Sequence, residues 1–256
     1  MRILGCQLDI VWENKQANLA KVQRLLEAAD PAPGTLVVVP EMFATGFSLN
    51  VAAIGEGEPS ETESWLGTIA QGYGIWMLAG LVRRGSDGRG RNEAVVFNPN
   101  GQLMARYAKI HPFSHGGETQ HYSAGDEVVT FDWSGCCVAP FICYDLRFPE
   151  IFRTAVRRRA QLFAVLANWP ARRASHWSTL LQARAIENQA YVVGVNRCGS
   201  DPHQVYRGWS VIIDPQGEVI ADAGEHEGTV SAEVGLGPLT TWRAEFPALR
   251  DMRWAT

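Results

Sequence analysis

The chain has 256 residues, of which 46% are hydrophobic and 20% are charged, and this composition excludes a disordered chain, a collagen and a coiled coil. Its 23 Lys and Arg residues and 27 Asp and Glu residues give a net charge of −4, which speaks against non-specific binding to nucleic acid. At this length one or two domains are allowed, with a core that needs no disulfides.

The first half of the chain alternates apolar strands with amphipathic helices. Leu19, Val22 and Leu26 recur at a spacing of three to four residues, which predicts a helix that ends before Pro31 and Pro33. The sequence predicts further elements in this half, namely strands at 3–10, 36–39, 75–82, 93–97 and 102–109 and helices at 14–29 and 61–71.

The second half repeats this order after a hairpin that turns at Ser134 and Gly135. Pro149 suits the first turn of a helix, and the apolar run that follows predicts a buried strand. The predicted elements are strands at 138–143, 162–166, 191–195, 211–214, 218–221 and 228–234 and helices at 149–159 and 175–189.

One internal repeat is visible. Residues 94–105 match residues 210–221 at an offset of 116, and residues 76–80 match 191–195 at an offset of 115. Any Asn/Asp-Pro-x-Gly hairpin would resemble another, but the second pair favours two similar halves. We therefore predict an α/β fold, a four-layer α-β-β-α sandwich in one domain over residues 1–256 with a C-terminal tail from about residue 235.

The amino terminus and the cysteines predict a cytosolic protein. No apolar run reaches the roughly 18 residues that span a bilayer, and Asp9 interrupts the first apolar segment before a secretory signal forms. The number of cysteines is odd and no C-x-x-C occurs, so neither a disulfide framework nor a zinc ribbon is expected from Cys6, Cys136, Cys137, Cys143 and Cys198.

Three polar residues follow predicted strands: Glu41, Lys109 and Cys143. Singly, each has an ordinary explanation as a helix cap or ion pair, a solvated lysine, or a small core residue. Together at strand ends they suit a nucleophilic hydrolase. A thiolate attacks, a carboxylate removes the thiol proton, and an ammonium stabilises the oxyanion.

Longer segments around these residues resemble the nitrilase superfamily of carbon–nitrogen hydrolases, in the family's order of Glu, Lys and Cys. The resemblance covers nearly the whole chain and is nearest to bacterial omega-amidases, which hydrolyse 2-oxoglutaramate and 2-oxosuccinamate. The segments are Pro40-Glu-Met-Phe43, Tyr107-Ala-Lys-Ile-His111, Ile142-Cys-Tyr-Asp-Leu-Arg-Phe-Pro-Glu150, Asn168-Trp-Pro170 and the residues from Ser175 to Tyr191.

The resemblance implies a role for each matching residue. Cys143 would be the nucleophile, Glu41 the base and Lys109 the stabiliser of the tetrahedral intermediate. The backbone N–H of Tyr144 would be the second oxyanion donor, and Glu118 would match a second glutamate that positions substrate and water. The family also implies a homodimer, a thioester intermediate and no metal or organic cofactor.

An omega-amidase substrate carries a carboxylate and a keto group at its far end, so the site should hold a cation there. Arg173 is our candidate, because arginine binds a carboxylate through two parallel hydrogen bonds, although it could also belong to a solvated loop. Arg147 is the other candidate, but we expect it to pair with an acid. Phe43, Phe113 and Trp169 either line the pocket or belong to the core.

Other signals are weak. The glycine-rich segment at 85–90 lies between two strands, so it predicts a hairpin rather than a phosphate loop. Arg157 to Arg159 form an isolated basic patch, and His111, His115 and His121 lack metal-site spacing. We expect no nucleic acid, membrane or metal partner. The alternatives are a nitrilase, a carbamoylase, an aliphatic amidase, or a catalytically silent binding protein.

Overall fold

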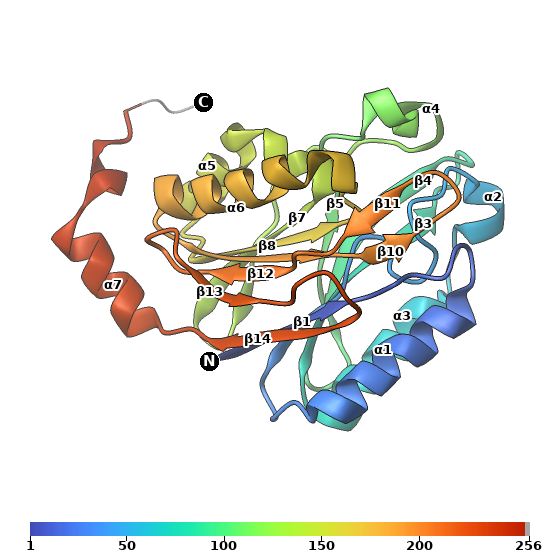
Figure 1. Ribbon diagram of the computed structural model, residues 1–256, viewed down its shortest axis with the longest axis horizontal. Coiled ribbons are helices and arrows are strands. Elements are labelled where there is room, and N and C mark those ends of the chain that lie inside the picture. Colours follow the sequence, from blue (N-terminus) through green and yellow to red (C-terminus); the bar gives the residue numbers. More distant parts are fainter. Residues whose placement is uncertain (254–256) are drawn as a thin grey trace.

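The computed structural model describes residues 1–253 and contains two six-stranded sheets packed face to face. In Figure 1, α1 and α3 cover the outer face of one sheet, whereas α5 and α6 cover the outer face of the other. These are the four layers that the sequence predicts. No helix within residues 1–253 is both long and apolar enough to cross a membrane.

The first sheet has the strand order β14-β1-β2-β3-β4-β5. The helices α1 and α3 connect parallel strands, whereas β3, β4 and β5 run antiparallel through hairpins. The elements of this half are β1 (Arg2–Gln7), α1 (Lys15–Ala29), β2 (Leu36–Val38), α2 (Val51–Ile54), α3 (Glu61–Tyr73), β3 (Trp76–Arg84), β4 (Gly90–Phe97), β5 (Leu103–Ala108), η1 (Ser114–Gly116) and α4 (Glu118–His121).

The second sheet has the order β13-β12-β9-β8-β7-β6 and repeats these strand directions. Its elements are β6 (Phe131–Trp133), β7 (Cys136–Ile142), η2 (Cys143–Arg147), α5 (Pro149–Arg157), β8 (Leu162–Ala167), η3 (Ala171–Arg173), α6 (Ala174–Asn188), β9 (Tyr191–Asn196), β12 (Val211–Ile213) and β13 (Val219–Asp222), and β14 (Gly228–Glu233) crosses to the first sheet. The internal repeat therefore marks two halves of the same topology.

The structure contains elements that the sequence did not predict. A small two-stranded sheet, β10 (Cys198–Ser200) with β11 (Val205–Arg207), stands where no element was predicted. The segment from residue 235 contains α7 (Leu236–Glu245), followed by η4 (Ala248–Asp251). Figure 1 shows α7 leading away from the sandwich at the left.

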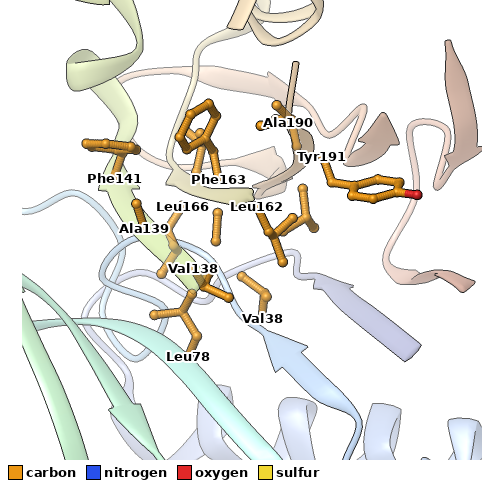
Figure 2. Packing of buried hydrophobic residues seen from close by; sticks show 14 of the residues in the cluster. Val38, Leu78, Val138, Ala139, Phe141, Leu162, Phe163, Leu166, Ala190 and Tyr191 are labelled. Atoms are coloured by element: carbon orange, nitrogen blue, oxygen red, sulfur yellow. The ribbon is translucent and has the colours of Figure 1, made fainter. Parts of the chain in front are cut away.

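The core lies between the sheets and beneath the helices, because central strands such as β2, β8 and β9 are buried along their whole length. Figure 2 shows Val38 and Leu78 of the first sheet beside Val138 of the second. These side chains are fully buried. The opposite faces of β2 and β3 pack against α1 and α3 in a second cluster. Strands β1, β2 and β3 of the first sheet are parallel, as are β7, β8 and β9 of the second, so within each set the carboxyl ends lie at one edge of the sheet.

Candidate active site

Glu41 lies in the turn directly after β2, and this turn packs tightly against β3. The backbone N–H of Phe43 donates to the Gly80 carbonyl at 3.0 Å. Met42 takes a φ of 44°, in the left-handed region, so the chain reverses sharply here. A Cβ on Gly80 would lie 2.5 Å from the Glu41 Cα, so only glycine fits beneath this turn.

The Glu41 carboxylate is fully buried and accepts hydrogen bonds at both oxygens. Its Oε1 accepts from Lys109 Nζ at 3.0 Å and from Asn92 Nδ2 at 2.7 Å. Its Oε2 accepts from the backbone N–H of Asn168 at 2.9 Å. Burial alone would raise the pKa of Glu41, but the Lys109 charge and these donors outweigh burial and hold the pKa below its usual 4.5. Glu41 is therefore ionised at neutral pH.

Lys109 follows β5 and lies between two glutamates. Its Nζ contacts Glu41 at 3.0 Å and the two carboxylate oxygens of Glu118 at 2.8 and 3.2 Å. Burial would lower the pKa of Lys109, but the negative charges of Glu118 and Glu41 raise the pKa well above its usual 10.5. Lys109 therefore stays charged and presents a fixed cation 5.5 Å from the Phe47 ring centre.

Cys143 begins η2 at the end of β7, with a φ of 48°. The buried Asp145 side chain holds this turn, because its Oδ2 accepts from the Ile142 N–H at 3.1 Å and the Tyr107 hydroxyl at 2.7 Å. A left-handed conformation at a non-glycine residue persists only where such contacts impose it. The Tyr144 N–H lies in the first turn of η2, where helix N–H groups lack partners within the helix.

The electrostatic surroundings of the Cys143 thiol are set by burial and by the charged groups Glu41, Lys109 and Glu118. Burial, followed by the negative charge of Glu41, raises the pKa of Cys143 well above its usual 9.0. The Cys143 thiol is therefore neutral at rest. The arrangement brings a thiol, a carboxylate and a cation into one site, which suits covalent catalysis on a carbonyl compound.

A cavity of about 640 Å³ opens over Cys143. Lys109, Tyr144 and Asn168 line it together with Cys143. The remaining lining residues come from loops of both halves and from the β10–β11 hairpin, and they include Trp12, Glu13, Phe47, Phe113, Arg147, Trp169, Arg172, Arg173, Asp201, His203 and Tyr206.

Most of the predicted substrate residues lie on this cavity. Arg173 lines it with its guanidinium 5.3 Å from the Phe113 ring centre, and the Trp169 indole N–H donates to the Arg173 carbonyl at 2.7 Å. Arg147 lines the cavity too, but the expectation that it pairs with an acidic residue is wrong. Arg147 Nη2 instead contacts His176 Nδ1 at 3.1 Å, and its guanidinium lies 4.9 Å from the Trp169 ring.

Phe43 does not line the cavity, so its interpretation as a pocket wall is wrong. Its side chain is fully buried in the cluster between the first sheet and its helices, with its ring centre 6.2 Å from that of Trp65. The reason is the reversal at Met42, which turns the next residue, Phe43, back toward the helix layer.

Sequence reasoning missed three polar residues that complete the site: Asn92, Asp145 and the side chain of Asn168. Asn168 and Asp145 lie inside the segments that resemble the family. Their membership of those segments was a signal that could have identified them. Asn92 lies in β4 outside every motif, and only the sheet brings it to Glu41. Within residues 1–253, no group of three His, Cys, Asp or Glu side chains could hold a metal ion.

Comparison with known proteins places the chain in a family. The carbon–nitrogen hydrolase family model matches residues 5–244. An omega-amidase, YafV, from Escherichia coli is 39% identical over 98% of this chain and 96% of its own length. A 2-oxoglutaramate amidase from Bacillus subtilis is 35% identical over 96% of this chain and 95% of its own length.

A solved structure also points to the carbon–nitrogen hydrolase family. A CN-hydrolase superfamily protein from Xanthomonas campestris, with an arsenic adduct in its active site, superposes with a TM-score of 0.94 and 35% identity, covering 100% of this chain and 98% of its own. The chain belongs to the carbon–nitrogen hydrolase family, also known as the nitrilase superfamily. Within that family it is an amidase, an enzyme that hydrolyses carboxylic amides.

Gly80→Ala tests how strictly the Glu41 turn is packed. We expect the added methyl group to displace Glu41 and to lower both amidase activity, at least tenfold, and the free energy of unfolding, by about 1–3 kcal/mol. Thermal unfolding and ammonia release measure the two effects. Gly72→Ala in α3 is the control, since a Cβ there meets nothing within 4 Å and should leave activity unchanged. Full activity of Gly80→Ala would contradict this account of the turn.

Proposed function

We propose that this amidase hydrolyses the terminal amide of a small 2-oxo dicarboxylic acid monoamide, such as 2-oxoglutaramate or 2-oxosuccinamate. The products are the 2-oxo acid and ammonia. The full-length similarity to an omega-amidase and a 2-oxoglutaramate amidase supports this substrate class. The observation that carries the proposal is a cavity that joins Cys143 to the guanidinium groups of Arg147 and Arg173.

The acylation half-reaction uses the contacts around Cys143. Glu41 accepts the thiol proton while Sγ attacks the amide carbon, and a tetrahedral intermediate forms. Lys109 Nζ and the Tyr144 N–H donate to its oxyanion, and stabilisation of this kind usually contributes most to the rate of such reactions. Glu41 then passes its proton to the nitrogen, the C–N bond breaks, and ammonia leaves a thioester on Cys143.

The deacylation half-reaction uses the same groups with water as the nucleophile. Glu41 accepts a proton from the water as its oxygen attacks the thioester carbon, and Lys109 and Tyr144 hold the second oxyanion. The C–S bond breaks, Glu41 returns the proton to the sulfur, and the acid departs. Glu118 contacts Lys109 through both of its oxygens, which supports a role in holding that cation in place.

The far end of the substrate is assigned to Arg173, with Arg147 beside it. Neither guanidinium pairs with a carboxylate among residues 1–253, so each is available to a substrate anion. Burial and the nearby charge of Arg172 lower the pKa of Arg173, because both disfavour the positive charge of its guanidinium. A bound carboxylate relieves that repulsion. Each guanidinium lies over an aromatic ring, that of Arg147 over Trp169 and that of Arg173 over Phe113.

Ammonia release from 2-oxoglutaramate, glutamine, a simple nitrile and an N-carbamoyl amino acid tests the substrate class. We expect turnover of 2-oxoglutaramate to be the fastest by far. In Arg173→Ala the Michaelis constant for 2-oxoglutaramate should rise at least tenfold, because a carboxylate-binding group is lost. Arg159→Ala, at an exposed position after α5, serves as the control.

Two outcomes would contradict parts of this proposal. Preferred turnover of another compound would overturn the substrate assignment while leaving the covalent chemistry. An unchanged Michaelis constant in Arg173→Ala would remove Arg173 from the substrate site. The homodimer and the cytosolic location stay predictions that follow from the family and from the amino terminus.

A further inference from the structure

Asn92 is a neutral side chain that contacts both glutamates of the site. It lies in β4, outside all the motif segments, and is 2% exposed. Its Nδ2 donates to Glu41 Oε1 at 2.7 Å and to Glu118 Oε1 at 2.9 Å. Its backbone carbonyl accepts from the Lys109 N–H at 2.9 Å. A single residue therefore touches all three charged members of the site.

The orientation of the Asn92 amide follows from its partners. Both neighbours of the amide nitrogen are carboxylate oxygens, which accept hydrogen bonds, so the nitrogen rather than the oxygen must face them. Both Nδ2 hydrogens are thereby used. The Oδ1 is buried and has no hydrogen-bond partner among residues 1–253. An unpaired buried acceptor is unfavourable, so the contacts of Nδ2 dictate the placement of this side chain.

The charges around Glu41 explain why two such hydrogens matter. Glu41 is faced by Lys109 after β5, Glu118 of α4, Cys143 of η2 and Tyr122. Two carboxylates share one ammonium, and like charges this close disfavour each other's ionised form. A neutral donor to both carboxylates offsets that repulsion without adding a charge that would compete with Lys109 for the oxyanion.

We propose that Asn92 is a positioning residue, which bridges the Glu41 and Glu118 carboxylates through its two Nδ2 hydrogens and so keeps Glu41 able to accept a proton. The inference rests on the proposed role of Glu41 as the base. Without Asn92, Glu41 keeps its contacts with Lys109 and Asn168 but loses the donor at 2.7 Å, so it takes up a proton at higher pH. Proton transfer from Cys143 then fails at a pH where the natural enzyme is active.

The test is the pH dependence of Cys143 alkylation by iodoacetamide in Asn92→Leu, followed by mass spectrometry of the Cys143 peptide. This readout needs proton removal from the thiol but no knowledge of the substrate. We expect the acidic limb of the alkylation rate to move upward by about one pH unit or more. A merely structural role would lower the rate by the same factor at every pH.

Asn188→Leu is the matched control, because Asn188 is another buried asparagine of this chain with an unpartnered Oδ1 among residues 1–253, but lies in α6 away from Glu41. It should leave the acidic limb in place. Should Asn92→Leu fail to fold, Asn92→Ser, which keeps one donor, is expected to shift the limb by less in the same direction. No shift in a folded Asn92 variant overturns the proposal.

Glu41→Gln separates this inference from the proposed function. If its Cys143 reacts as fast as in the natural enzyme, Glu41 is not the base, and the catalytic proposal fails together with the inference. If Glu41→Gln reacts slowly and Asn92→Leu shows no shift, the base assignment stands and only the role of Asn92 is overturned.

Discussion

Cys143→Ala should reduce amide hydrolysis by about 10⁴-fold or more, since removal of a covalent nucleophile leaves only binding and oxyanion stabilisation. The substitution removes one sulfur atom from the start of η2. Asp145 keeps its hydrogen bonds to Ile142 and Tyr107, so the turn should stay in place. The thermal unfolding temperature should therefore change little, and ammonia release at saturating substrate gives the lost rate.

Cys137→Ala is the control for Cys143→Ala. Cys137 is the other partly exposed cysteine among residues 1–253, and it lies in β7 away from the cavity. Its removal should leave turnover unchanged. With the natural enzyme, rapid acid quenching should trap an acyl group on the Cys143 peptide, and mass spectrometry detects it. Substantial turnover by purified Cys143→Ala would end the thioester mechanism.

Glu41→Gln should lower the rate constant of acylation by about 10²- to 10⁴-fold, the range that general-base catalysis contributes. Glutamine has nearly the same shape but cannot accept the thiol proton. Its amide nitrogen also meets donors on either side, because Lys109 and Asn92 donate to one carboxylate oxygen and Asn168 donates to the other. Single-turnover kinetics isolates the acylation step.

The matched control for Glu41→Gln is Glu93→Gln. Glu93 is likewise buried and ion-paired, to Arg83 and Arg106, and it follows Asn92 in β4 with its side chain on the opposite face of the sheet. We expect Glu93→Gln to unfold at a lower temperature yet to keep its rate constant. An equal loss of rate in both variants would show that a buried charge, rather than the base, was responsible.

The pKa directions also fix the sign of the pH dependence. The pKa of Glu41 lies below 4.5, so activity should fall only when acid protonates this carboxylate. The pKa of Cys143 lies well above 9.0, so free thiolate should not appear as a titration between about pH 6 and 9. The rate kcat/KM should be level across that range, and a limb within it would contradict the assignment of Glu41 as the base.

The sequence predicts the fold well because the signal is local and repeated. Apolar runs such as 162–166 are too short for helices and lack a polar face, so they become strands buried on both sides. The hairpins near residues 99 and 215 repeat at an offset of 116, and the structure places them at equivalent positions, β4–β5 and β12–β13, of the two sheets. The β10–β11 sheet escapes prediction because its strands, which read CGS and VYR, carry no apolar run or clear alternation.

By itself, the sequence determined the two halves, the order of strands and helices, and the three residues Glu41, Lys109 and Cys143 at strand ends. These features depend on apolar periodicity and on motifs of a few residues, which are visible in the linear chain. Only the tertiary structure decided that Phe43 faces the core, that Gly80 must lack a Cβ, that Asn92 contacts Glu41, and that Asp145 holds the turn at Cys143. Each of these depends on the packing of strands far apart in the chain, and no pattern within one strand carries that information.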